Sequence, residues 1–258
     1  MIYINGDSHS AGAEIVNGYC FAEDDPKYIA WGKRPHPEAI PETYGYKLAR
    51  VMNQPFHTDA ESASSNDRIL RTTKKFIEET QDKKHLFVVI GWATWEREEW
   101  KDGEDFVQVT ASGTDSVPEY MAEDYKQWVT EQTEQELDRK TQYWHDTIWD
   151  LHCNLNEAGI KHLFFNTYLQ LESNEMKDWG DSYLSPYDME GTYYYWLQQN
   201  GHQTVNPNSY HYGAQAHTAW FQNILPHVQK QYTIKTGLTN ITKRSIVTKA
   251  KQEFKGFN

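Results

Sequence analysis

The chain has few cysteines, no long apolar run and no overall excess of basic residues. Two cysteines, Cys20 and Cys153, in 258 residues are too few for a disulfide framework or a cysteine-rich metal cluster, and this low number is typical of a reducing compartment. No uninterrupted apolar stretch approaches the roughly 18 residues that a membrane-spanning helix needs. No basic-then-apolar leader with a cleavage site is present either. We therefore expect a cytoplasmic protein with no membrane partner.

The formal net charge of −12 at pH 7 argues against a general nucleic-acid binder. The charge is uneven, because residues 231–258 carry six Lys or Arg and a single acidic residue. We divide the chain into a domain of residues 1–230 and a basic C-terminal tail of residues 231–258. The tail is expected to be solvated, to fold back on the acidic body, or to bind an acidic partner.

Alternating strand and helix patterns predict an α/β fold with a mainly parallel sheet. Residues 2–5, 85–91 and 160–166 are apolar and are expected to be strands, the second with both faces covered. Residues 55–59 are a weaker strand candidate. Apolar residues at helical spacing predict helices in the segments between and after these strands. They are expected over 42–53, from an N-cap at Asn66, up to Gly159, from 192 to near Gly201, and from Ala214 onward.

Two segments between these elements lack a steady period. Residues 13–41 are rich in Pro, Gly and charge and are expected to form a long loop, such as a lid or a substrate rim. Residues 101–123 are polar and are expected to be an insertion. Ten Trp and seventeen Tyr could stack on sugars or fill a core.

A short strand at the N-terminus leads directly into Gly6-Asp7-Ser8. The Gly permits a tight turn with close backbone approach. Ser8 would then present its hydroxyl at the carboxyl edge of the sheet, where open α/β sheets bind ligands. A serine hydroxyl becomes a nucleophile only beside a positioned base. The alternative is that these three residues form a turn and nothing more, since all are common in turns.

Over residues 1–230 the motifs resemble those of the SGNH (GDSL-type) hydrolases. Gly6-Asp7-Ser8 corresponds to the first block of that family. Ala-Gly-Ala-Glu at 11–14, Ser-Ser-Asn-Asp-Arg-Ile at 64–69, and Ile-Gly-Trp followed by Arg97 and Glu98 are similar to a branch found in tailed bacteriophages and some bacteria. The resemblance implies a flavodoxin-like three-layer sandwich with a mainly parallel sheet of about five strands.

The resemblance also implies roles for individual residues. Ser8 matches the nucleophile, and His211 matches the general base. Asn208 stands where the family has the Asp that orients the base, and an Asn carbonyl can still accept the imidazole N–H. The backbone N–H groups of Ser8 and Ala63 match the oxyanion donors, and Thr94 is the nearest substitute for a missing side-chain donor, the family's Asn.

The remaining candidates are binding residues, namely Asp7, His9, Asn66 and Trp92. Three of them have a structural alternative: Asp7 could fix the turn, Asn66 could cap a helix and Trp92 could fill the core. His217 falls on a position that is not catalytic in the family and is expected to pack or to make a polar contact.

The function implied is a serine esterase or acyl hydrolase without a cofactor, acting in a host cytoplasm or a virion. Aromatic loops and an acidic rim favour a neutral sugar ester or an O-acetylated glycan as the substrate. Two alternatives remain open. The chain could be a weak or inactive glycan-binding or structural protein. It could also be a metallophosphoesterase, because Asp7-Ser8-His9 has the Asp-x-His spacing that opens such sites.

Overall fold

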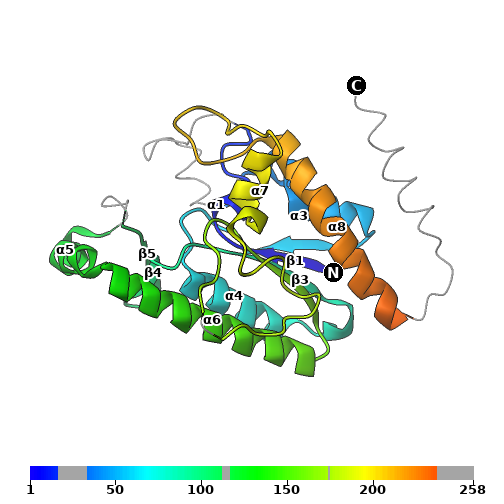
Figure 1. Ribbon diagram of the computed structural model, residues 1–258, viewed down its shortest axis with the longest axis horizontal. Helices are drawn as coiled ribbons and strands as arrows, with labels where there is room; N and C mark the ends of the chain where they lie inside the picture. The colour runs from blue at the N-terminus through cyan, green and yellow to red at the C-terminus, as the bar shows by residue number, and fades with distance from the viewer. Residues whose placement is uncertain (17–33, 112–116, 174, 237–258) are drawn as a thin grey trace.

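The computed structural model describes residues 1–16, 34–111, 117–173 and 175–236 (Figure 1). Most of the expected lid at 13–41 lies outside the described residues, as do Cys20 and the tail from residue 237 onward. In the part of the chain that is described, no helix is both long and apolar enough to cross a membrane.

A parallel sheet forms the centre of the molecule and confirms the predicted α/β class. Its strands are β1 (Ile2–Asn5), β2 (Phe56–Thr58), β3 (Phe87–Trp92) and β6 (Lys161–Asn166), in the spatial order β2-β1-β3-β6. All three pairings are parallel. About five strands were expected, whereas this sheet has four. Beside β6 a single parallel bridge joins Phe164 to Tyr183, so the fifth position holds an extended segment that pairs only briefly.

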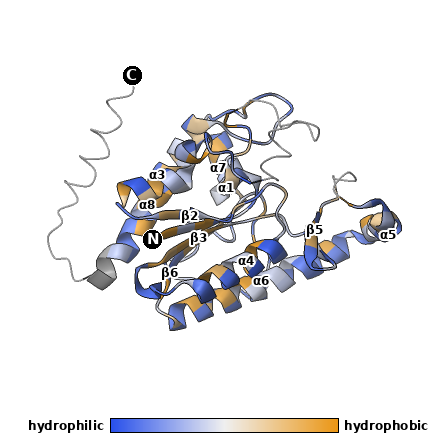
Figure 2. Ribbon diagram, turned by 180° about the vertical axis from the view of Figure 1, so that it is seen from behind, coloured by the Kyte–Doolittle hydropathy of each residue, from blue (hydrophilic) through white to orange (hydrophobic). Residues whose placement is uncertain are grey.

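Helices cover both faces of the sheet, which gives three layers (Figure 1). Alternate residues of β1, such as Ile2 and Tyr3, point to opposite faces, as a strand requires. One apolar core contains Ile2 and Ile4 and lies against α3, α7 and α8. The other contains Tyr3 and lies against α4 and α6. Figure 2 shows the apolar strands enclosed between helices with hydrophilic outer surfaces.

The helices agree with the predicted periodicity, with small differences at their ends. Ser65, not Asn66, is the N-cap of α4, because the Ser65 hydroxyl accepts the backbone N–H of Arg68. The last helix continues past residue 230, so the predicted domain boundary falls inside it. The helical elements are α1 (Ser8–Ala11), η1 (Ile40–Glu42), α3 (Tyr44–Val51), α4 (Asn66–Glu79), η2 (Lys83–His85), η4 (Glu119–Met121), α5 (Ala122–Glu131), α6 (Glu134–Glu157), η5 (Met189–Gly191), α7 (Tyr193–Gln199) and α8 (Ala214–Thr236).

The polar insertion expected at 101–123 is more ordered than its sequence suggested. It contributes to an antiparallel hairpin of β4 (Glu98–Asp102) and β5 (Asp105–Val109). A small core of its own, centred on Val109, Tyr125 and Trp128, joins the hairpin to α5. Both ribbon views show this unit at one end of α6, beyond the central sheet (Figures 1 and 2). The aperiodic sequence concealed the hairpin because its strands are short and half exposed.

Candidate active site

The carboxyl ends of the parallel strands bring the candidate residues to one edge of the sheet. β1 ends at Asn5, and Gly6 makes the turn into α1 with a φ of 153°. A Cβ at Gly6 would lie 2.3 Å from the Ser10 hydroxyl and 2.8 Å from the Gly91 carbonyl. Both distances are shorter than real contacts allow, so only glycine fits where β1 and β3 meet in this way. The turn places Ser8 at the first position of α1.

Ser8 and His211 come together from opposite ends of the chain. The Ser8 Oγ lies 2.8 Å from Nε2 of His211. Ser8 is 7% exposed, and the His211 side chain keeps 16% of its surface accessible. A serine hydroxyl at hydrogen-bond distance from an imidazole nitrogen is the arrangement that activates a nucleophile. Both residues were singled out from the sequence.

The other nitrogen of His211 contacts Glu14, which sequence reasoning did not assign a role. The distance from His211 Nδ1 to Glu14 Oε2 is 2.6 Å. With Nδ1 protonated and donating to this carboxylate, Nε2 is left free to accept the Ser8 hydroxyl. The structure therefore gives the orienting position to Glu14, not to Asn208. Asn208 is exposed, and its backbone N–H donates to Asn206 Oδ1.

Glu14 is itself held in place by a second serine. The Ser209 hydroxyl donates to Glu14 Oε2 and accepts the backbone N–H of His211. The Glu14 side chain is 4% exposed, and the backbone at this residue is left-handed, with a φ of 63°. Non-glycine residues adopt this conformation when the surroundings hold them there, and such residues cluster at functional sites. The sequence signal was present in the Ala-Gly-Ala-Glu motif, which ends at Glu14.

Two backbone N–H groups are the expected oxyanion donors. One belongs to Ser8 itself and the other to Ala63, whose loop is bonded to the turn before Ser8 because the Glu61 N–H donates to the Gly6 carbonyl at 3.1 Å. No hydrogen bond joins the N–H of Ser8 or of Ala63 to another residue in the described part of the chain. Ala63 has a φ of 65°, the left-handed conformation that glycine adopts most easily. Together these donors could bind an oxygen that becomes negatively charged during a reaction.

Asn66 and Thr94, two other residues predicted to act in the site, form hydrogen bonds within the protein instead. The Asn66 amide bonds both backbone groups of Ala93, donating to its carbonyl at 3.0 Å and accepting its N–H at 2.8 Å. Asn66 therefore fastens the loop after β3 to the start of α4 and is unavailable to a substrate. The Thr94 hydroxyl donates to Glu96 at 2.7 Å. Its proton is therefore already used and cannot serve the expected role of oxyanion donor.

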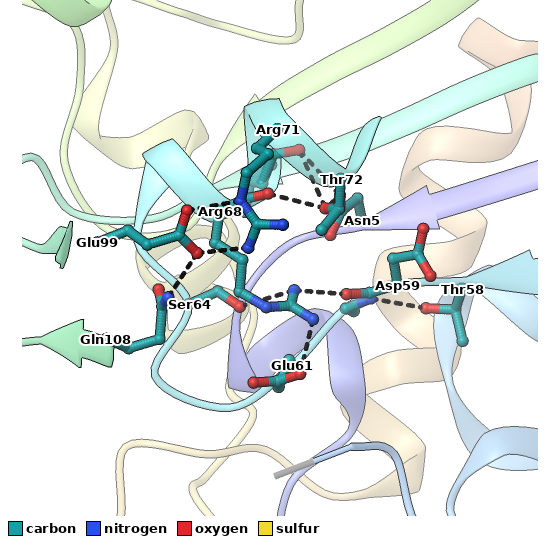
Figure 3. A network of polar contacts seen from close by, with 12 residues as sticks. Asn5, Thr58, Asp59, Glu61, Ser64, Arg68, Arg71, Thr72, Glu99 and Gln108 are labelled. Atoms are coloured by element: carbon teal, nitrogen blue, oxygen red, sulfur yellow. Dashed lines mark hydrogen bonds and ion pairs between the residues drawn. The ribbon is translucent and has the colours of Figure 1, made fainter. Parts of the chain in front are cut away.

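A polar network fixes the loop that carries Ala63 (Figure 3). From α4, Arg68 donates to the Asp59 carbonyl at 2.8 Å and to Glu61 at 2.6 Å, and it also reaches the Ser64 hydroxyl. From β5, Gln108 accepts the N–H of Ser65 at 2.8 Å. The loop is thus bonded on both sides, which restrains the backbone beside Ala63.

The same network continues into the β4–β5 hairpin. Gln108 donates to Glu99 at 2.8 Å, and Arg71 of α4 forms a two-pronged ion pair with Glu99 at 2.7 and 2.6 Å. Figure 3 shows these side chains converging between α4 and the hairpin. The insertion is therefore hydrogen-bonded to α4 and to the loop that carries Ala63.

Asp7, His9 and Arg97 form a buried charged group beside Ser8. Asp7 caps α1 by accepting the N–H of His9 at 3.0 Å, and it pairs with Arg97 at 3.4 Å. Although burial alone would raise it, the pKa of Asp7 is held at about 2 by His9 and Arg97. Burial lowers the pKa of His9 against the opposing pull of Asp7. Asp7 thus remains a carboxylate whose oxygens already have partners.

The last candidates have structural surroundings. Trp92 is fully buried between Trp144 and Phe164, so it belongs to the core and not to a binding surface. His217 is buried, accepts the N–H of Tyr44 and faces the Tyr193 hydroxyl, as expected for a packing residue. Within the described ranges, no group of three or more His, Cys, Asp or Glu side chains could hold a metal ion. In the Asp-x-His pair that suggested a metallophosphoesterase, the carboxylate of Asp7 is already bonded by His9 and Arg97.

Comparison with known proteins gives one finding. Residues 23–192 match a family described as a family of unknown function (DUF6071), and the chain belongs to it. The matched range begins after Glu14 and ends before His211. No curated protein and no solved structure matches the chain.

Proposed function

We propose that this member of a family of unknown function is a serine acyl hydrolase of the SGNH type. The observation that carries the proposal is the connected series Ser8–His211–Glu14, with 2.8 Å between Ser8 Oγ and His211 Nε2 and 2.6 Å between His211 Nδ1 and Glu14 Oε2. Nucleophile, base and orienting carboxylate in this order are recognised by geometry and not by their order along the chain.

The chemistry follows from the positions of these atoms. Ser8 Oγ attacks the carbonyl carbon of an ester while its proton moves to His211 Nε2. The carbonyl oxygen becomes an oxyanion and is held by the N–H groups of Ser8 and Ala63. His211 then returns the proton to the leaving alcohol, which gives an acyl-serine. A water molecule, deprotonated by His211, releases the carboxylic acid and restores Ser8.

Glu14 supplies what an Asn at this place could not. Protonation of His211 creates an imidazolium, and a carboxylate at Nδ1 stabilises that positive charge as well as fixing the tautomer. The Asn at position 208, where the SGNH hydrolases have Asp, is therefore compatible with activity, because Glu14 supplies the carboxylate from the other end of the sequence. A small ester such as an O-acetylated glycan remains the substrate class that we propose.

The test is mass spectrometry after incubation with a fluorophosphonate, which reacts only with activated serines. We expect one adduct on Ser8, lost in Ser8→Ala and in His211→Ala. An exposed-histidine variant, His85→Gln, controls for non-specific effects and should be labelled like the wild type. No adduct on folded wild-type protein would contradict the proposal and favour a binding or structural module.

A further inference from the structure

Arg97 lies beside Ser8 with most of its hydrogen-bond donors unused. Its Nη1 donates to Asp7 Oδ2 and to the Ser64 carbonyl, both at a long 3.4 Å. Its Nε is buried without an acceptor, and no hydrogen bond joins Nη2 to another described residue. The side chain is 17% exposed. A guanidinium has five N–H donors, and leaving buried donors unpaired is unfavourable.

The position of Arg97 relates it to the reacting groups. Asp7 directly precedes the proposed nucleophile, and Ser64 directly follows Ala63. The guanidinium therefore lies between the two loops whose backbone N–H groups face an incoming carbonyl. The backbone after Arg97 is fixed, since Glu98 pairs with Lys140 at 2.6 Å and Glu99 pairs with Arg71 at 2.6 Å.

Two further hydroxyls without acceptors lie at the neighbouring strand end. The hydroxyls of Thr167 and Tyr168, which follow β6, are buried and unpaired. The Tyr168 ring meets the His9 ring edge-on, with centroids 5.1 Å apart. Its hydroxyl also interacts electrostatically with Asp7 and Arg97. The Tyr168 hydroxyl and the Arg97 guanidinium are therefore both near Asp7, and a ligand with several acceptor oxygens would satisfy their unused donors.

We propose that Arg97, assisted by the hydroxyl of Tyr168, binds an oxyanionic group of the substrate, a carboxylate or a phosphate. The planar fork of a guanidinium matches both groups and forms strong charge-assisted hydrogen bonds with them. This inference rests on the proposed hydrolase and narrows its substrate to esters that carry a negative charge. The small esters proposed above, O-acetylated glycans included, are thereby limited to those that carry a carboxylate or a phosphate. The neutral sugar ester expected from the sequence is set aside, because the positive charge of Arg97 lies at the site itself.

The test compares esters that differ in one charge. 4-Acetoxybenzoate and 4-acetoxyphenyl phosphate are charged at pH 7, and methyl 4-acetoxybenzoate is not. We expect kcat/KM to favour the charged esters by at least about tenfold, after correction for their spontaneous hydrolysis. Arg97→Gln should lower kcat/KM for the charged esters by about tenfold or more, the usual effect of losing a charge-assisted hydrogen bond, and should thereby remove most of the preference. Arg97→Lys should fall between, and Arg139→Gln, at an exposed arginine of α6, should keep the preference.

Two results would overturn the inference. The wild type could show no preference, or Arg97→Gln could leave the preference unchanged while slowing all esters equally. The second result would place Arg97 on the reacting carbonyl oxygen, which every ester shares. Thermal melting of Arg97→Gln and Arg139→Gln separates loss of binding from loss of folding.

A binding measurement separates failure of the inference from failure of the hydrolase. Calorimetric titration of Ser8→Ala with 4-hydroxybenzoate and with phenyl phosphate needs no turnover. Binding that is lost in Ser8→Ala combined with Arg97→Gln supports the anion site, even if wild-type Ser8 does not react with the fluorophosphonate. Equal binding by the single and the double variant contradicts it, whatever Ser8 does.

Discussion

The two sides of the candidate site differ in how fully their polar groups are paired. We call Ser8, His211, Glu14 and Ser209 the relay side, where each side chain is hydrogen-bonded to the next. The oxyanion side consists of the N–H groups of Ser8 and Ala63 together with Arg97. Among the described residues, neither N–H group has an acceptor, and Nε of Arg97 has none either. If the chain is the hydrolase that we propose, proton transfer is arranged before a ligand binds, whereas the oxyanion side is prepared for charge that arrives with the substrate.

The two sides also rest on different foundations. The relay side joins residues about 200 positions apart, and the ring of His211 lies against the buried ring of His9, with centroids 5.0 Å apart. The oxyanion side is anchored by arginine–carboxylate pairs of α4, Arg68 with Glu61 and Arg71 with Glu99. Variants of the relay side should therefore change mainly kcat. Variants of the oxyanion side should displace the backbone N–H groups and lower the stability of the fold.

The largest effect is expected at Glu14. Glu14→Gln keeps an acceptor for His211 Nδ1 but removes the charge that stabilises the imidazolium, so kcat should fall by about 10² to 10⁴. Steady-state hydrolysis of an activated acetate ester measures this. KM should change little, because no substrate contact is lost.

Asn208→Ala is the matched control, because Asn208 is the residue that the sequence pattern had placed in this role. It is exposed, and we expect its rate to stay within about twofold of the wild type, as for most surface changes. The opposite pattern, a slow Asn208→Ala and a normal Glu14→Gln, would mean that the acid was assigned to the wrong residue.

These two residues mark how far the sequence could lead. The parallel sheet, the turn at Gly6 and the meeting of Ser8 with His211 follow from periodicity, from glycine geometry and from the block pattern. Glu14 could not be assigned, because its role depends on a left-handed backbone that carries a loop residue across to His211. Such a contact between residues 197 positions apart leaves no spacing rule in the sequence.

The hairpin is the second feature that sequence reasoning did not capture. Half-exposed strands show little periodicity, so residues 101–123 were expected only as an insertion. The hairpin reaches the candidate site through single polar contacts, such as that of Gln108 with the N–H of Ser65. Asn66 and Thr94 show the same limit, since a polar residue near a site can be consumed by backbone or side-chain partners that only the fold brings close.

Acid should destabilise the fold through the buried His217. Burial lowers the pKa of His217 to about 3, with His9 and Lys47 as further causes, whereas an unfolded histidine titrates near 6.5. Between these values the unfolded chain binds more protons than the folded one. The free energy of unfolding therefore decreases as pH falls from about 6.5 towards 3, by up to about 1.4 kcal/mol per pH unit from this residue.

Urea denaturation at pH 7, 5.5 and 4.5 measures this slope. His217→Gln, which can still accept the Tyr44 N–H, should flatten it, although the variant is less stable at pH 7. His85→Gln, at an exposed histidine, should leave the slope as it is. An unchanged slope in His217→Gln would assign the acid sensitivity elsewhere, with His162 next, because burial also lowers its pKa to about 3.

A smaller effect is expected where the hairpin supports the oxyanion side. Gln108→Ala removes the acceptor of the Ser65 N–H and leaves Glu99 with one partner fewer, so we expect a loss of about 1–2 kcal/mol in stability. Displacement of the neighbouring Ala63 N–H should lower kcat about tenfold, less than loss of the donor itself. Gln127→Ala, at an exposed α5 glutamine that bonds Glu131, is the control. A normal kcat in Gln108→Ala would show that the hairpin stabilises the fold without positioning the site.

The smallest effect is expected at Ala63, and its sign is informative. The left-handed backbone at φ 65° costs an alanine about 1 kcal/mol relative to glycine. Ala63→Gly relieves this strain but adds freedom to the unfolded chain, which offsets roughly 0.5–1 kcal/mol. The free energy of unfolding should therefore change by less than about 0.5 kcal/mol, while Ala63→Val, whose branched Cβ fits this conformation worst, should cost more than about 1 kcal/mol. Equal stability of the glycine and valine variants in urea denaturation would mean that the loop leaves this conformation in solution. The Ala63 N–H would then not be held in position before a substrate binds.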